Sequence, residues 1–197
     1  MFSNILSATI QGINAQIINV ETDMSNGLPM FNIVGSPGPE VKEARDRIRA
    51  ALKNNDITIP ASRITVNLSP GDLRKDGTAF DLPMTIGLLT AMDYLPENCA
   101  KDMLFLGELS LDGEIKPVRG VLPIVQTAAR KGIKECIIPL DNAREGSIVP
   151  GIKVRGARTI MEVIFYLMSK DEDVLPSVYT DPLSLIEKSN DILPDFD

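Results

Sequence analysis

The order of its secondary-structure signals predicts a mixed fold for this chain, an α+β or α/β two-layer sandwich. The first third alternates apolar and polar residues in the runs 5–11 and 15–23, which is the two-residue period of half-buried strands. The clearest helical pattern of the chain follows, over residues 39–54. Strands and helices then alternate to about residue 168.

The first strands are expected to form a hairpin that turns at Gln11-Gly12, and a further strand is expected over Pro29–Val34. The turn 35–39 then ends the strand and opens the helix predicted over Pro39–Asn54. The core face of that helix is predicted from five apolar residues at helical spacing, Val41, Ala44, Ile48, Ala51 and Leu52.

The remaining elements follow from the same two periodicities. Asp81 suits the N-terminal cap of a second helix, with Pro83 in its first turn. A hairpin is predicted around Asp112-Gly113. The other expected elements are strands over residues 63–68, 135–139 and 152–154, and helices over residues 118–131 and 159–168.

The net charge of -7 is distributed unevenly along the chain. Residues 170–197 carry eight acidic side chains and two lysines, whereas residues 1–169 sum to -1. This acidic, proline-punctuated stretch is typical of a linker. We therefore expect a folded domain over residues 1–169 and an acidic linker over residues 170–197.

Composition excludes several classes of site. The chain has no histidine, which removes Ser-His-Asp and Cys-His catalysis and the histidine-bearing zinc sites. Cys99 and Cys136 stand alone, so two buried or partly buried free thiols are expected and no metal. There is no tryptophan and only 5% aromatic content, which disfavours a base-stacking platform. With no long apolar run and no secretory signal, we expect a cytoplasmic protein without membrane contact.

No nucleotide site is predicted either. The sequence contains neither a G-x-x-x-x-G-K-[ST] run nor a G-x-G-x-x-G run. The glycine-containing turn before the first helix lacks two N–H donors, at Pro37 and Pro39, so a structural turn is favoured over an anion site. Asp72, Asp76 and Asp81 are better explained by turn capping than by a metal. No cofactor is therefore expected in this chain.

Three runs of the sequence carry a family resemblance: residues 27–52, 63–89 and 106–139. They closely resemble the N-terminal domain of the ComM/YifB group, the magnesium-chelatase-like (ChlI-like) AAA+ ATPases. The resemblance covers most of residues 1–168. It implies the α+β two-layer βαβ sandwich that the proteolytic domain of Lon also has.

The resemblance extends to Lon, whose catalytic dyad is a serine in KDGPSAG and a lysine in PIGGLK. The matching runs here are KDGTAFD and PVRGVL, which place Ala79 at the serine and Leu122 at the lysine. A Ser-Lys dyad needs a hydroxyl nucleophile and an amine that accepts its proton. Neither Ala79 nor Leu122 supplies such a group, so the resemblance implies a domain without protease activity. Thr78 stands one residue away and is interpreted as a turn residue.

A basic stripe on the first helix is the main candidate interaction site. Lys42, Arg45, Arg49 and Lys53 recur at helical spacing, and Arg74 and Lys75 add to them from a loop. A solvated helix face is the alternative interpretation. If the cations cluster in space, the site residues Lys42, Arg45, Arg49, Arg74 and Lys75 are expected to contact DNA or a neighbouring subunit.

Two functions of different class remain. The resemblance implies an accessory domain of a ComM-type ATPase, a hexameric DNA helicase that promotes branch migration in natural transformation. Its AAA+ module, which would bind ATP and magnesium, would follow this chain, and the module and neighbouring ring subunits would be its partners. The alternative is a Lon-like serine hydrolase with a displaced nucleophile. Tetrapyrrole metallation rests on the chelatase label alone, because no residue here supports it.

Overall fold

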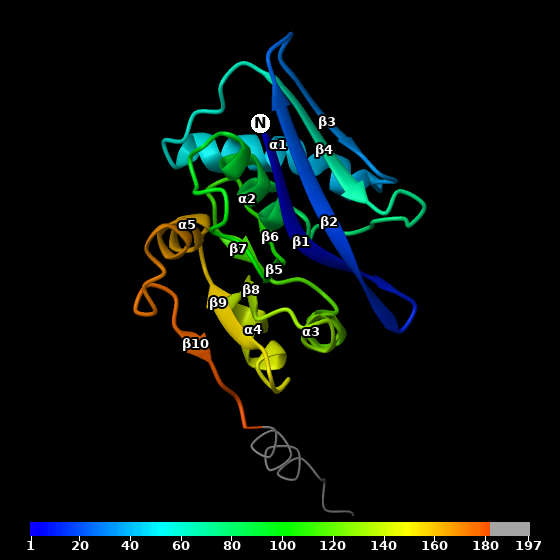
Figure 1. Ribbon diagram of the computed structural model, residues 1–197, viewed down its shortest axis with the longest axis vertical. Helices are drawn as coiled ribbons and strands as arrows, with labels where there is room; N and C mark the ends of the chain where they lie inside the picture. The colour runs from blue at the N-terminus through cyan, green and yellow to red at the C-terminus, as the bar shows by residue number, and fades with distance from the viewer. Residues whose placement is uncertain (182–197) are drawn as a thin grey trace, which may run out of the picture.

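The structure is a computed structural model, and it describes residues 1–181. An eight-stranded sheet with the order β10-β9-β8-β5-β1-β2-β4-β3 forms its centre (Figure 1). Its strands are β1 (Phe2–Gln11), β2 (Asn14–Ser25), β3 (Met30–Val34), β4 (Arg63–Ser69), β5 (Met103–Phe105), β8 (Glu135–Pro139), β9 (Lys153–Ala157) and β10 (Ser177–Val178). A separate small hairpin consists of β6 (Glu108–Leu109) and β7 (Ile115–Lys116).

The helices follow the predicted order with one addition. They are α1 (Pro39–Asn54), α2 (Asp81–Ala91), α3 (Val121–Arg130), α4 (Leu140–Gly146) and α5 (Ile160–Ser169). The predicted bounds of α1 are confirmed, since its apolar face is regular over four turns and Pro39 occupies its first turn. Neither the short helix α4 nor the two-residue strand β10 was predicted, because neither is long enough to show a period.

Two kinds of strand pairing meet in the sheet. β1 and β2 form the predicted hairpin, in antiparallel register from Phe2 opposite Asp23 to Gln11 opposite Asn14. The turn between them is Gly12-Ile13, one residue later than expected, and Gly12 has a φ of 62° that suits glycine. β5, β8 and β9 pair in parallel beside β1. The expected mixed sandwich of helices and one sheet is confirmed.

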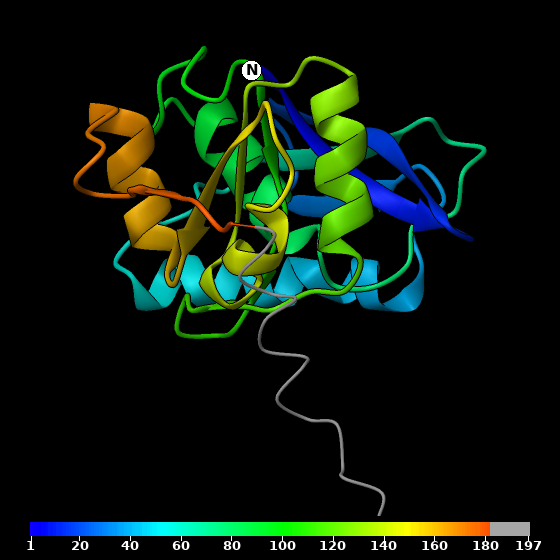
Figure 2. The same cartoon turned by 90° about the horizontal axis from the view of Figure 1, so that it is seen from below.

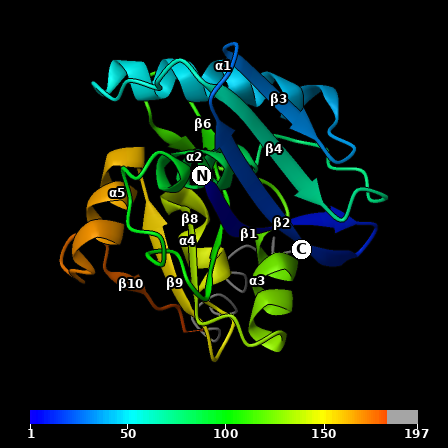
Figure 3. The same cartoon turned by 45° about the horizontal axis from the view of Figure 1, so that its top comes forward.

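Side-chain alternation in the strands divides the core in two. Phe105 and Ile137 join the larger cluster, with α1, α2 and α5, whereas Leu104 and Cys136 join the smaller cluster, with α3. Figure 3 accordingly places α1 and α3 on opposite sides of β1 and β2, and Figure 2 shows α5 and α3 on either side of the parallel strands. Both cysteines are buried free thiols, as expected, and burial raises the pKa of Cys136 to about 12.

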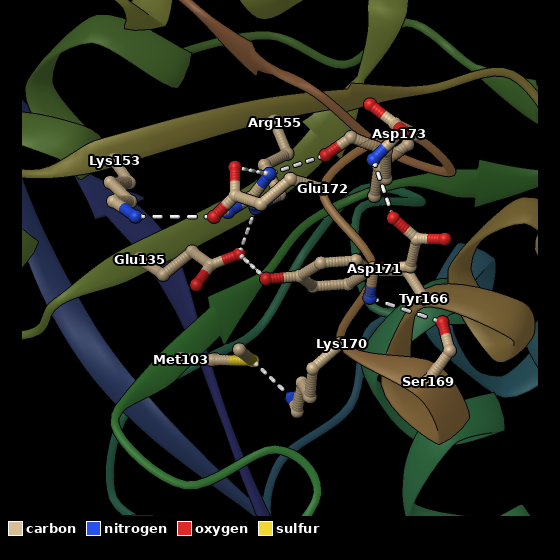
Figure 4. Close-up of polar contacts among 11 residues, drawn as sticks. Met103, Glu135, Lys153, Arg155, Tyr166, Ser169, Lys170, Asp171, Glu172 and Asp173 are labelled. Carbon is tan, nitrogen blue, oxygen red and sulfur yellow. Dashed lines mark hydrogen bonds and ion pairs between the residues drawn. The ribbon is translucent and has the colours of Figure 1, made fainter.

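The expected domain boundary at Lys170 is wrong for residues 170–181. Leu175 is buried in the larger cluster, and β10 extends the sheet by pairing with β9. Arg155 holds this segment: its guanidinium donates to the Glu172 carboxylate and to the Leu175 carbonyl (Figure 4). The acidic composition had indicated a linker, but one of its carboxylates, that of Glu172, pairs here with a buried cation.

The same arginine connects the segment to the core of the domain. Arg155 also pairs with Glu135 on β8 and lies 4.5 Å above the ring of Tyr166, whose hydroxyl donates to Glu135 at 2.7 Å (Figure 4). We call these four residues, Glu135, Arg155, Tyr166 and Glu172, the Arg155 clasp. The rest of the expected linker, residues 182–197, lies outside the described residues. In residues 1–181 no helix has the length and apolar character needed to cross a membrane.

Candidate functional site

The two positions expected to carry a Lon-type dyad lie near the starts of α2 and α3. Ala79 comes two residues before the first residue of α2, and Leu122 is the second residue of α3. Backbone hydrogen bonds fix the first of them: Gly107 donates to the Ala79 carbonyl, and Leu82 donates to the Gly107 carbonyl, both at 3.0 Å. The Leu122 N–H donates to the Glu145 carboxylate at 3.1 Å.

A cleft of about 640 Å³ opens beside Ala79. Its other walls are β1 near Thr9, the hairpin at Glu108 and the segment 117–120 that leads into α3. Since a nucleophile and its base must be in contact, the Lon match predicts that Ala79 and Leu122 face one another. Both pack against the smaller core cluster, but only Ala79 also lines the cleft. The cleft therefore presents an alanine methyl group where a Lon-type serine would stand.

Thr78, the residue before Ala79 in the sequence, carries a hydroxyl. It lines the cleft, and its Oγ1 donates to the Glu108 carboxylate. Within residues 1–181 no lysine ammonium makes a hydrogen bond to a hydroxyl. The chemistry available to Thr78 is therefore that of a hydroxyl bonded to a carboxylate, without the amine base of a Ser-Lys pair.

Lys75 corrects the predicted basic site. Its side chain is fully buried, and its ammonium donates to the carbonyl of Gly35 at 2.8 Å and to that of Pro70. Burial lowers its pKa. Lys75 therefore fastens the loop before α2 to the turn before α1, and it is not available to phosphates. Sequence spacing places it beside Arg74 but does not reveal which of the two points inward.

The backbone of the turn before α1 is engaged by the Lys75 segment and does not form a nucleotide site. The Gly38 N–H donates to the Lys75 carbonyl at 2.7 Å, which engages a donor that a phosphate would need. Gly35 has a φ of +91°, and a Cβ there would lie 2.3 Å from the backbone oxygen of Leu68. The residues present thus do not fit a phosphate group.

The other four predicted cations are exposed. Lys42, Arg45 and Arg49 lie on the outer face of α1, and Arg74 borders a depression at its N-terminus. Arg45 pairs with Asp46 at 3.1 Å and Arg74 with Asp76 at 2.8 Å, but both pairs are on the surface, where solvent screens them. Four of the five predicted residues are therefore exposed: Lys42, Arg45 and Arg49 share one face of α1, and Arg74 lies beside the N-terminus of that helix.

A buried ion pair beside this stripe was missed by sequence reasoning. Arg47 lies on the same helix and donates twice to the Asp81 carboxylate, at 2.6 and 2.9 Å, while the Leu109 N–H donates to Asp81 at 3.0 Å. Asp81 is fully buried, and the cap position before α2 is Phe80. The prediction that Asp81 caps this helix is thus wrong, because the carboxylate instead joins α1, α2 and β6.

The position of Arg47 on a helical wheel of α1 indicates that its side chain lies at the edge of the core. Arg47 lies three residues after the buried Ala44 and four before the buried Ala51, so it borders the apolar face more closely than Arg45 does. Arg47 also pairs with Glu43, one turn earlier on α1, at 3.7 Å, but Glu43 is exposed. The buried partner of Arg47 could be identified only from the tertiary contact.

Comparison with known proteins identifies the family. The model for "Subunit ChlI of Mg-chelatase" matches residues 20–142. The chain belongs to this ChlI-like family. It is similar to the competence protein ComM of Haemophilus influenzae, with 42% identity over 168 residues, which is 85% of this chain and 33% of that protein. It is also similar to the uncharacterized protein YifB of Escherichia coli, with 41% identity over 140 residues, 71% of this chain and 28% of that protein.

A weaker similarity extends to Lon. The chain is 30% identical to Lon protease 2 of Syntrophobacter fumaroxidans over 142 residues, which is 68% of this chain and 18% of that protein. The ChlI-like chain thus spans about a third of the length of the ComM and YifB relatives that it matches. The Lon similarity agrees with the fold seen here, in which the cleft beside Ala79 lies at the start of α2.

Proposed function

We propose that this ChlI-like chain is a non-catalytic accessory domain of a ComM-type AAA+ ATPase in the cytoplasm. The absence of both dyad groups, at Ala79 and Leu122, is the observation that carries the non-catalytic part. The full protein would be a hexameric ring that promotes DNA branch migration in natural transformation. ATP and magnesium would bind its AAA+ module, because the turn before α1 in this chain does not fit a phosphate.

The exposed cations of α1 support contact with DNA or with a neighbouring ring subunit. Lys42, Arg45 and Arg49 present charge to solvent over about two turns of helix, and Arg74 extends it. Such a patch attracts phosphates locally even though the body of the chain is nearly neutral. Binding would be weak and independent of sequence, because these side chains lie on a convex helix face and not in a groove-reading arrangement.

A fluorescence titration with duplex DNA at several salt concentrations tests this proposal. Each neutralised phosphate contributes about 0.9 to the slope of log K against log salt, so three to four cations give a slope of roughly -3 to -4. Replacing Arg45 and Arg49 with glutamate should abolish binding and leave the circular dichroism spectrum unchanged. Lys131→Glu with Lys134→Glu, which makes the same change in net charge at the end of α3, is the matched control.

Two outcomes contradict DNA contact by this domain. Equal binding by the Arg45/Arg49 variant and the parent would make the stripe a solvated helix face or a subunit contact. No binding by the parent even at low salt would assign the DNA contacts of the full protein to its ATPase module.

The alternative function is a Lon-like hydrolase that uses Thr78, and the bond from Thr78 to Glu108 is the observation in its favour. A carboxylate is a poorer base toward a hydroxyl than the amine of a Ser-Lys pair. Casein digestion and labelling with a serine-reactive probe separate the two functions. Activity in rigorously purified protein that disappears in Thr78→Val would establish the hydrolase and refute the accessory role.

A further inference from the structure

A second cavity lies beside the C-terminal half of α1. It has a volume of about 430 Å³ and is enclosed by the C-terminal half of α1, the segment 57–62 and the start of β4. Most of its wall is apolar and comes from Pro29, Ile57, Ile59, Pro60, Ala61 and Ile64. We call this cavity the α1–β4 hollow. It is separate from the cleft beside Ala79, with which it shares no lining residue.

Two cations stand at this apolar surface without a carboxylate. Arg49 and Lys53 line the hollow, and none of its lining residues is acidic. Arg49 is held by the ring of Phe31, with its guanidinium carbon 5.8 Å from the ring centroid. Within residues 1–181 neither cation forms an ion pair, whereas Arg45 and Arg47 on the same helix both do. The positive charge at the hollow is therefore available to a ligand.

The combination of apolar wall and free cations selects among ligands. DNA phosphates need the cations but gain nothing from an apolar recess. A protein segment with an apolar side chain next to carboxylates uses both, since burial of the side chain supplies affinity and the cations supply orientation. The hollow also lies beside Met30, the first residue of the edge strand β3, and an edge strand can pair with an extended segment.

We propose that the α1–β4 hollow binds an extended acidic segment of a partner protein. An apolar side chain of that segment fills the space between Ile57, Ile59 and Ile64, and its carboxylates pair with Arg49 and Lys53. This site shares Arg49 with the DNA contact proposed above, but it differs from that contact in its apolar wall, which plays no part in phosphate binding.

Fluorescence anisotropy with a labelled synthetic peptide, Gly-Asp-Asp-Leu-Phe-Asp-Asp-Gly, tests the proposal. Saturable binding is expected at peptide concentrations below about 1 mM. Two control peptides separate the components: one replaces Leu-Phe with Gly-Gly, and the other replaces every Asp with Asn. Each should bind roughly tenfold more weakly, because each retains only half of the recognition chemistry.

Variants of the chain locate the binding. Arg49→Glu with Lys53→Glu should weaken peptide binding by roughly tenfold or more. Ala61→Phe should block the hollow, and since Ala61 is exposed this change does not disturb the core. Lys131→Glu with Lys134→Glu is the control for net charge and should leave the affinity within about twofold. Ala61→Phe should also leave binding to duplex DNA unchanged.

Three results would overturn the proposal. One is the absence of saturable binding of the Leu-Phe peptide at about 1 mM. Another is an equal loss of affinity in the two charge-reversal variants, which would show non-specific attraction. The third is a loss of DNA affinity in Ala61→Phe, which would assign the hollow to nucleic acid. Because Arg49 belongs to both proposed sites, Ala61→Phe is the variant that separates them: it changes the hollow and leaves every cation in place, so either proposal can fail alone.

Discussion

Two groups of basic side chains lie in this domain, and they are used in opposite ways. Arg155 is fully buried, and its guanidinium reaches two carboxylates, one backbone carbonyl and an aromatic ring. The cations Lys42, Arg45 and Arg49 on α1 are exposed, and only Arg45 among them forms an ion pair, with its neighbour in sequence. A buried charge must be paired, whereas an exposed one remains available to a ligand.

This difference indicates that only the exposed cations without internal partners are candidates for ligand binding. Lys75 and Arg47 sit in or beside the predicted stripe, but both are committed to internal partners. The prediction from sequence wrongly included Lys75 in the interaction surface. It also did not identify Arg47 as the partner of a buried carboxylate. Three measurements test the difference between the buried, paired cations and the exposed ones.

The largest effect is expected for Arg155→Met. This change leaves Glu135 in the core without its cation and releases Glu172 and the Leu175 carbonyl. Breaking a buried pair from one side costs about 3–5 kcal/mol, and we expect that loss in the free energy of unfolding. Urea denaturation followed by circular dichroism measures it. Lys153→Met is the control, because its bond to Glu172 is exposed and its loss should cost less than about 1 kcal/mol. Equal losses in both variants would contradict the clasp.

A smaller effect separates two arginines of α1. Arg47→Met removes the partner of the buried Asp81, which retains the Leu109 N–H, so we expect a loss of about 2–3 kcal/mol. Arg45→Met removes only an exposed pair and should change stability by about 0.5 kcal/mol or less. The same urea titration compares them. If Arg45→Met is the more destabilising variant, the assignment of committed and available cations along this helix is wrong.

The smallest effect concerns pH and the segment 170–181. Hydrogen bonds from Arg155 and Lys153 lower the pKa of Glu172 from 4.5 to about 2. The stabilising contribution of Glu172 is therefore present above about pH 4.5 and is lost as the pH falls toward 2. The protection factors of the Ser177 and Val178 amides, which correct for intrinsic exchange, should fall over that interval. In Glu172→Gln the protection should be lower than in the parent above about pH 4.5, should equal it near pH 2, and should lack this pH dependence. An unchanged profile in the variant would assign the effect to other carboxylates.

The residues at the candidate cleft could be predicted only in part from the family pattern. The match to Lon placed Ala79 and Leu122 at the dyad positions, and the structure puts them near the starts of α2 and α3. The cleft beside Ala79 depends on how the hairpin at Glu108 and the segment 117–120 fold together. The bond from Thr78 to Glu108 joins residues 30 apart in sequence, so no local pattern predicts it.

The sequence alone determined the order of the elements, the bounds of α1, the hairpin of β1 and β2 and the absence of histidine chemistry, because each depends on local periodicity or composition. The family resemblance was also evident from the sequence. Which charged side chains are internal could be seen only from the tertiary contacts. Lys75 and Asp81 are buried by contacts with segments about 30 to 40 residues away. Residues 170–181 join the body because the buried Arg155, on β9, pairs with Glu172 and donates a hydrogen bond to the Leu175 carbonyl. The burial of a charge depends on partners that are distant in sequence, and the fold alone brings them together.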